Sequence, residues 1–426
     1  MQYLVDLYGD VPYIEAFKDV NNPTPKYDDD QYVYRQLIAE LDSATQLIID
    51  ANSHAQDIAS YDVMMQGDMT KWAQFANTVK LRMLLRMSNN TGAVAAYRDQ
   101  QLQDLANSVS VNNFGFLTTD VTINPGYSSA TNEQENPFFG AYSYDAAGAA
   151  TQNWTFVAMS GHAYKYLRNF PASNGTEVVT GSGARYPGVA DPRASRIFRG
   201  TLKGVTQGST TVDVPSSGTP ARNGYGIFNP YVTQPEPVAY VSDLLKMASN
   251  DGFVMTASEA YFIQAEAAVR YASWFPSIDA QTSFESGISA SFDRLGVTLI
   301  NPSAYATYMA AISNPSNPLM QGLGWPASTT PDLQIRAIMT QKWIALMGVH
   351  AIESFIDYNR TGYPVTPLAL TATQTRKPRR LIYPTSEYVA NSANVPNITP
   401  TEIFATTNPT HPFWMLGDPA MVSSKK

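Results

Sequence analysis

The sequence contains no cysteine and only four histidines, which stand far apart. The missing thiols exclude disulfides, thiolate metal sites and cysteine nucleophiles. The histidines show neither the HxH nor the HExxH spacing of a histidine-based metal centre. We therefore expect neither a metal site nor any other cofactor. A secreted eukaryotic domain would carry disulfides, whereas many bacterial envelope proteins do without them.

Charged residues are also scarce, at 15% of the chain, and the net charge is −8. Arg376-Lys-Pro-Arg-Arg380 is the one basic run, so the sequence offers no basic face for nucleic acid. Residues 295–331 lack charge, but prolines and asparagines break this stretch, which excludes a membrane span and leaves room for a short helix at Tyr305–Ile312. The N-terminus shows no signal peptide, because its apolar segment Met1–Leu7 is too short.

Aromatic residues are abundant, with 25 Tyr, 18 Phe and 6 Trp making up 12% of the chain. The excess of tyrosine over phenylalanine predicts rings that bury one apolar face and keep a polar tip in water. Such rings suit a binding surface.

Helical periodicity marks segments that come in pairs: 30–49 with 70–87, 256–271 with 283–295, and 332–348 with 351–358. Thr256-Ala-Ser-Glu259 is a capping box, Gly296 is placed to end a helix, and Asp332 is placed to cap one. The pairs resemble tetratricopeptide units, but their uneven spacing excludes an uninterrupted solenoid.

Residues 92–250 carry little regular pattern apart from a helix expected at His162–Phe170 and small hairpins expected at Val178–Thr180 and Thr210–Val214. We therefore predict a mainly all-α fold of tetratricopeptide-like helix pairs with large loop and small-hairpin insertions. The expected organisation is a single domain, 1–426. It has helical pairs at about 1–90 and 256–364, a loop-rich insertion at about 92–250 and a wrapping tail at 365–426.

Short motifs along the chain resemble those of the SusD/RagB family of outer-membrane nutrient-binding lipoproteins, in the family's order. The matching segments are Leu7-Tyr-Gly-Asp-Val-Pro-Tyr13, Pro25-Lys-Tyr-Asp28, Lys71-Trp72, Ala265-Glu266-Ala267, Gly287-Ile288, Gln341-Lys-Trp-Ile-Ala345, Arg360-Thr-Gly-Tyr-Pro364 and Arg379 to Pro384. Two features depart from the family pattern. Its N-terminal segment, with the signal peptide and the lipid-bearing cysteine, is missing, and Phe413-Trp414 replaces its tail tryptophan pair.

The resemblance implies a helical, non-catalytic protein on the cell-surface side of the bacterial outer membrane. Its role would be to capture a glycan, or a peptide, and to deliver it to a SusC-like TonB-dependent barrel as partner. Membrane association would run only through a lipid anchor that this chain does not contain. The aromatic content fits a sugar binder independently, because flat rings stack on the apolar faces of pyranoses.

Two other functions remain as alternatives. A glycoside hydrolase needs two carboxylates roughly 5 to 9.5 Å apart across a groove, and Glu133 and Glu135 lie in an aromatic loop that could be imagined in that role. A tetratricopeptide-type scaffold for protein interactions fits the helices but not the aromatic insertions. We expect no enzymatic activity.

We expect the ligand to be held by loops rather than by helical motifs. The candidate ligand-binding residues are Tyr127, Tyr142, Tyr144, Trp154 and Trp325. In contrast, the tryptophans within or beside the helical motifs are expected in the core, namely Trp72, Trp274 and Trp343.

Two clusters of charge have a structural and a functional interpretation. Asp28-Asp-Asp30 suits a helix N-terminus, or alternatively a cation. Arg82 and Arg86 stand one turn apart and suit carboxylates on a neighbouring helix, or alternatively an anionic ligand.

Overall fold

The computed structural model describes residues 1–50, 57–149, 151–153, 160–168, 189–197, 247–313, 322–368, 372–405 and 411–415. This part of the chain is mainly helical, as the sequence predicts. Its longer helices are α2 (Asp30–Asp50), α3 (Met69–Arg86), α4 (Gly92–Asn112), α9 (Ala257–Arg270), α10 (Ala280–Arg294), α12 (Ala304–Ile312), α13 (Pro331–Ala345) and α14 (Ala351–Thr361). The shorter elements are α1 (Gln2–Tyr8), α5 (Pro137–Tyr142), α7 (Gly161–Arg168), α8 (Ala194–Ile197), α11 (Val297–Ile300), α15 (Thr385–Ala390), β1 (Val121–Ile123) and β2 (Gly252–Met255).

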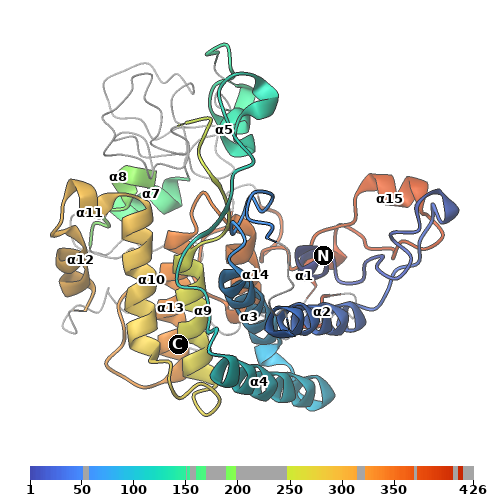
Figure 1. Ribbon diagram of the computed structural model, residues 1–426, viewed down its shortest axis with the longest axis horizontal. Coiled ribbons are helices and arrows are strands. Elements are labelled where there is room, and N and C mark those ends of the chain that lie inside the picture. The colour runs from blue at the N-terminus through green and yellow to red at the C-terminus, as the bar shows by residue number, and fades with distance from the viewer. Residues whose placement is uncertain are drawn as a thin grey trace.

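The helices pair as the sequence predicts. α2 packs on α3, α9 on α10 and α13 on α14 (Figure 1). α9 also contacts both α3 and α13, so it connects the first pair to the last. The helices α7, α12 and α15 lie around these packed pairs.

The ends of α9 and α10 follow their sequence signals. The Thr256 hydroxyl accepts a hydrogen bond from the Glu259 amide at 3.1 Å, and Gly296 adopts φ 65° just after α10. The expectation that Asp332 caps α13 is wrong by two positions. Thr330 is the N-cap and Pro331 occupies the first turn, which suits proline because that turn needs no amide donor.

α9 is buried on two sides, which explains its alanine-rich sequence. Phe262 and Ala265 belong to one hydrophobic cluster, with α10 and α13, whereas Ile263 and Ala267 belong to another, with α2, α3 and α4. α10 approaches closely at Gly287, because a Cβ there would lie 2.9 Å from the Phe262 ring. The small side chains therefore set the spacing of the helices.

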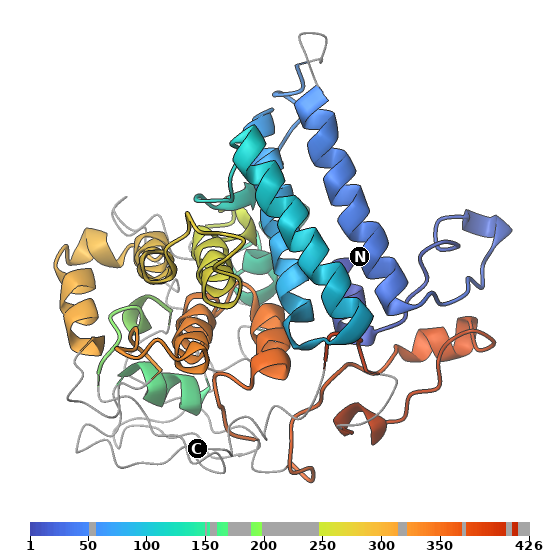
Figure 2. The same ribbon diagram turned by 90° about the horizontal axis from the view of Figure 1, so that it is seen from below.

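The expectation of weak structure from residue 92 onward is wrong for its first part. Residues 92–112 form α4, which packs beside α3 (Figure 2). Only Arg98, Leu102 and Leu105 of α4 are buried, so its apolar stripe is too thin to mark a helix in the sequence. The expected helix at 162–170 is present as α7, and the expected hairpins lie outside the described residues.

The two described strands pair antiparallel across a long sequence separation, with Val121 opposite Met255. Part of the chain's tail contacts its N-terminal segment. Leu381 donates its amide to the Leu7 carbonyl at 2.8 Å, and Tyr27 donates its hydroxyl to Glu387 at 2.8 Å. Among the described helices, none has the length and apolar character that crossing a bilayer requires.

Candidate ligand-binding site

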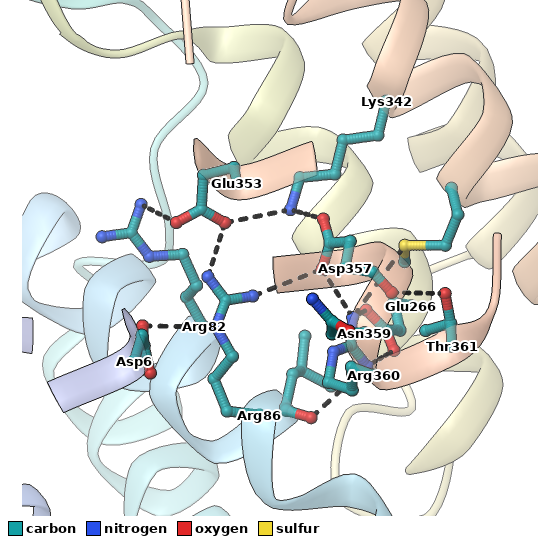
Figure 3. Close-up of polar contacts among 12 residues, drawn as sticks. Asp6, Arg82, Arg86, Glu266, Lys342, Glu353, Asp357, Asn359, Arg360 and Thr361 are labelled. Atoms are coloured by element: carbon teal, nitrogen blue, oxygen red, sulfur yellow. Dashed lines mark hydrogen bonds and ion pairs between the residues drawn. The ribbon is translucent and has the colours of Figure 1, made fainter. Parts of the chain in front are cut away.

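A buried network of charged residues fixes α13 relative to its neighbours (Figure 3). Arg86 of α3 donates to Glu353 of α14 at 2.6 Å, and Arg82 of α3 donates to Glu259 of α9 at 2.8 Å. Lys342 of α13 lies 2.8 Å from Asp357 of α14. The network therefore joins α3, α9, α13 and α14 through their charged side chains.

The electrostatics of this network explain why charges are tolerated there. Burial by itself raises the pKa of Glu353, but Arg86 and Arg82 outweigh it and lower that pKa to about 2. Arg82 and His350 do the same for Glu259, whose pKa also falls to about 2 despite burial. Arg82 and Arg86 thus meet carboxylates of neighbouring helices, which confirms the structural interpretation of this arginine pair.

A cavity with a volume of about 650 Å³ opens between α7, α13 and residues 366–368 and 372–378. A volume of this size suits a small ligand. Its wall is mostly apolar and includes the residues Ala163, Met347, Pro367, Leu368, Pro378 and Phe404. The wall also includes the polar side chains of Ser160, Thr366, Thr373 and Gln374.

An aromatic group on α7 and α13 forms one wall of this cavity. The Trp343 indole lies 5.9 Å from the His162 ring, with the two planes tilted by 36°. The Tyr166 ring meets the same indole edge-on, with centroids 5.1 Å apart. Trp343 is half-buried and packs against the hydrophobic core, which agrees with the core position expected from the sequence, and it also lines the cavity.

A basic segment forms another part of the lining. Arg376 and Lys377 both line the cavity, and they belong to the single basic run of the sequence. The Lys377 ammonium group donates to the Thr366 hydroxyl and lies 4.2 Å from the centre of the Tyr358 ring. Burial lowers the pKa of Lys377 to about 8.

The loop residues expected to bind ligand lie elsewhere. Tyr142 at the end of α5 packs its ring 5.1 Å from Phe138, and Tyr127 and Tyr144 are half-buried in the neighbouring loops. Trp325 packs against Phe284 of α10, with ring centroids 5.3 Å apart. None of these four lines the cavity, and Trp154 lies outside the described residues. Their role in binding stays a prediction.

The other expected core tryptophans are half-buried and pack on hydrophobic clusters. Trp72 belongs with the small cluster around Met65, and its indole donates to Asp62 at 2.8 Å. Trp274 packs on the cluster of α2, α3 and α4. Sequence reasoning missed the cavity residues His162, Trp343 and Lys377. The basic run at 376–380 was the available signal, because it stands out in an acidic chain.

The acidic residues at the start of α2 serve mainly as backbone acceptors. Carboxylate oxygens of Asp10, Asp29 and Asp30 lie within 4.8 Å of one another. However, Asp29 accepts from the Tyr32 amide at 2.9 Å, and Asp30 accepts from the Phe413 amide at 2.7 Å. Asp10 accepts from the Asp30 amide at 3.1 Å. Within the triplet, only Asp29 therefore caps α2, whereas Asp28 accepts from the Tyr13 and Ile14 amides and Asp30 from the tail.

A smaller cavity of about 310 Å³ lies between α8, α11 and α12. Valine, isoleucine, alanine and proline side chains form much of its wall, and Tyr308 is the one aromatic residue among those lining it. The Tyr308 side chain is buried, with its hydroxyl accepting from Gln341 at 3.0 Å. The larger cavity is therefore the better candidate for ligand binding.

Two family models match the chain. One, described as starch-binding and associating with the outer membrane, matches residues 1–142. The other, described as the SusD and RagB outer membrane lipoprotein, matches residues 186–415, which is more than half of the chain. The chain belongs to the SusD/RagB family. This confirms the resemblance carried by the short motifs.

Solved structures of SusD homologues share this fold. A chitin-binding SusD homologue from Flavobacterium johnsoniae superposes with a TM-score of 0.65 at 23% identity, covering 99% of this chain and 79% of the other. A SusD homologue from Bacteroides uniformis gives a TM-score of 0.63 at 22% identity, covering 98% of this chain and 78% of the other. No curated protein matches the sequence.

Proposed function

We propose that this SusD-like chain captures a glycan without chemical conversion at the bacterial cell surface and delivers it to a SusC-like TonB-dependent barrel. The observation that carries the proposal is the cavity with the Trp343 indole on its wall. An indole presents a flat apolar face to a pyranose ring, and the surrounding hydroxyl and amide groups can bond to sugar hydroxyls. The cavity is large enough for a short oligosaccharide segment.

The composition of the lining supports binding rather than hydrolysis. A glycoside hydrolase needs two carboxyl groups on either side of the scissile bond. No aspartate or glutamate stands among the described residues that line the cavity. Glu133 is exposed and Glu135 is buried, and neither belongs to the lining. Both family models, moreover, describe binding or lipoprotein families.

The family supports the location and the partner. Both matching family descriptions name the outer membrane. A glycan as ligand agrees with the description of a structural neighbour as a chitin-binding protein. A lipoprotein that binds glycan at the surface requires a transport partner in the same membrane, and a TonB-dependent barrel supplies that path.

A binding screen tests the proposed function. The purified chain is titrated with soluble polysaccharides, chito-oligosaccharides and peptides, and the mixtures are then assayed for new reducing ends. We expect saturable binding to at least one glycan with no release of reducing ends. Binding of peptides alone would favour the protein-interaction alternative, and product release would favour the hydrolase.

Co-purification with a SusC-like TonB-dependent barrel tests delivery. Both proteins are expressed together in an outer membrane, and the complex is isolated through a tag on this chain. A stable complex supports the transporter partnership. Recovery of this chain alone contradicts it, even if the glycan binds.

A further inference from the structure

The basic run at 376–380 borders the cavity. Arg376, Lys377 and Pro378 line the cavity directly. The next two residues, Arg379 and Arg380, are almost completely buried, at 2% and 1% exposure. The run thus places two basic side chains, Arg376 and Lys377, in the cavity lining, whereas Arg380 donates to the Tyr8 carbonyl.

The charge of the cavity contrasts with that of the whole chain. The protein has a net charge of −8, with 36 acidic residues against 28 basic ones. Nevertheless, the described lining holds Arg376 and Lys377 and no acidic residue. An excess of positive charge at a concave surface attracts anions.

Lys377 is the cationic side chain best placed to bind an anion in the cavity. In the part of the chain that the structure describes, no carboxylate lies within ion-pair distance of its ammonium group. The group donates to the Thr366 hydroxyl and faces the Tyr358 ring. A lysine ammonium carries three donors, so at least one remains for a ligand beside the contacts with Thr366 and Tyr358. A partly buried cation without an anionic partner is costly, and an anionic ligand would offset that cost.

His411 lies near Arg379 and Arg380, and burial together with these arginines lowers the pKa of His411 to about 4. Arg379 also donates its amide to the Ile403 carbonyl at 2.8 Å, next to the cavity residue Phe404. The backbone bond places the end of the basic run next to this cavity residue.

We propose that the cavity selects an acidic sugar, whose carboxylate or sulfate group pairs with Lys377 while its ring lies against Trp343. This inference rests on the proposed function, since it names the class of glycan that the same site takes. An ionised acceptor on the ligand turns an ordinary hydrogen bond to the ammonium into a charge-assisted one. A neutral glycan would leave Lys377 without a counter-charge.

Calorimetric titration of the full chain with matched probes shows whether the cavity prefers a carboxylate or a sulfate. Oligogalacturonate supplies carboxylates, and its fully methyl-esterified form is the neutral match. Carrageenan oligosaccharides supply sulfates, and agaro-oligosaccharides are their neutral match. Chito-oligosaccharides complete the panel. We expect one acidic probe to bind about tenfold or more tighter than its neutral match, with the advantage shrinking as salt is raised.

Two variants of one residue keep the test independent of folding. Lys377→Met should remove the preference for the acidic probe, whereas Lys377→Arg, which keeps the positive charge, should retain it. Lys18→Met is the matched control, because Lys18 is exposed and is not among the cavity-lining residues. Melting curves of all three variants establish that each is folded.

The outcomes distinguish this inference from the proposed function. Equal binding of acidic and neutral probes, or an unchanged acidic preference in a folded Lys377→Met protein, overturns the acidic-sugar inference while glycan capture stands. Failure of every glycan, acidic or neutral, to bind overturns both.

Discussion

The ammonium nitrogen of Lys342 lies 2.8 Å from a carboxylate oxygen of Asp357, and this ion pair joins α13 to α14. The next residue along α13, Trp343, lies on the wall of the cavity. Successive helical residues point in directions about 100° apart, so anchoring Lys342 inside the network also fixes where Trp343 points. The rigid scaffold and the candidate site are therefore adjacent parts of one helix.

Trp343→Ala should weaken glycan binding about tenfold or more, because it removes the largest ring of the cavity. Trp274→Ala is the matched control, since Trp274 packs on a different hydrophobic cluster. The control should melt earlier and keep its Kd. Calorimetric titration and melting curves measure both effects. Equal Kd values for wild type and Trp343→Ala would place the glycan elsewhere on the protein.

Trp325→Ala tests the loop residues expected from the sequence. The Trp325 ring packs against Phe284 at 5.3 Å between centroids. Its removal should therefore lower the melting temperature and leave the Kd unchanged, since the residue does not line the cavity. A variant that binds glycan tenfold more weakly yet melts normally would support the loop site instead.

Glu353→Gln should destabilise the protein by about 3–5 kcal/mol, because it leaves buried arginine charge without its partner. Asp99→Asn is the control. Its ion pair with Arg98 is 47% exposed on the aspartate side, and its loss should cost at most about 1 kcal/mol. Urea unfolding measures both. Similar free energies of unfolding for the two variants would contradict a stabilising role of the network.

Acid should destabilise the protein through the same carboxylates. Glu259 and Glu353 have folded-state pKa values of about 2, below the ordinary value of 4.5. Their stabilising contribution is thus fully present above the ordinary pKa and disappears as pH falls through the folded one. Unfolding free energies measured between pH 5 and pH 2 should fall steeply in the wild type. Glu353→Gln should show a shallower slope, and an unchanged slope would contradict the assignment.

Binding of an acidic glycan should weaken at alkaline pH. Burial lowers the pKa of Lys377 to about 8, and only the protonated amine pairs with an anion. Each pH unit above this pKa leaves about tenfold less protonated amine, so the Kd should rise between pH 8 and pH 9. Lys377→Arg should show no such rise, because guanidinium stays charged over this range. An unchanged wild-type Kd up to pH 9 would show that Lys377 does not contact the ligand.

Local sequence patterns were sufficient for much of the helical scaffold. α2, α9 and α10 begin and end close to their predicted residues, because capping side chains and Gly296 act over one turn. α4 escaped prediction because few of its residues are buried. The pairing of Val121 with Met255 could not be found either, since it joins segments far apart in the chain.

Some features of the candidate cavity could likewise be predicted from the sequence, and others could not. The basic run at 376–380 was visible in the sequence, but its place beside Trp343 was not. The aromatic loops were visible too, yet the described members of that set do not line the cavity. Periodicity assigned Trp343 to the core, against which it does pack, but a pattern within one helix cannot show that residues 366–368 and 372–378 form a cavity beside it.

The sequence by itself determined the helices, their pairing and, through its ordered motifs, the family. Each of these depends on residues within a turn or two of one another, or on a motif that can be compared directly. Only the tertiary structure decided which charges pair and which residues share a cavity. Arg86 meets Glu353, and Lys377 meets Tyr358, through contacts between helices and loops that no local pattern specifies.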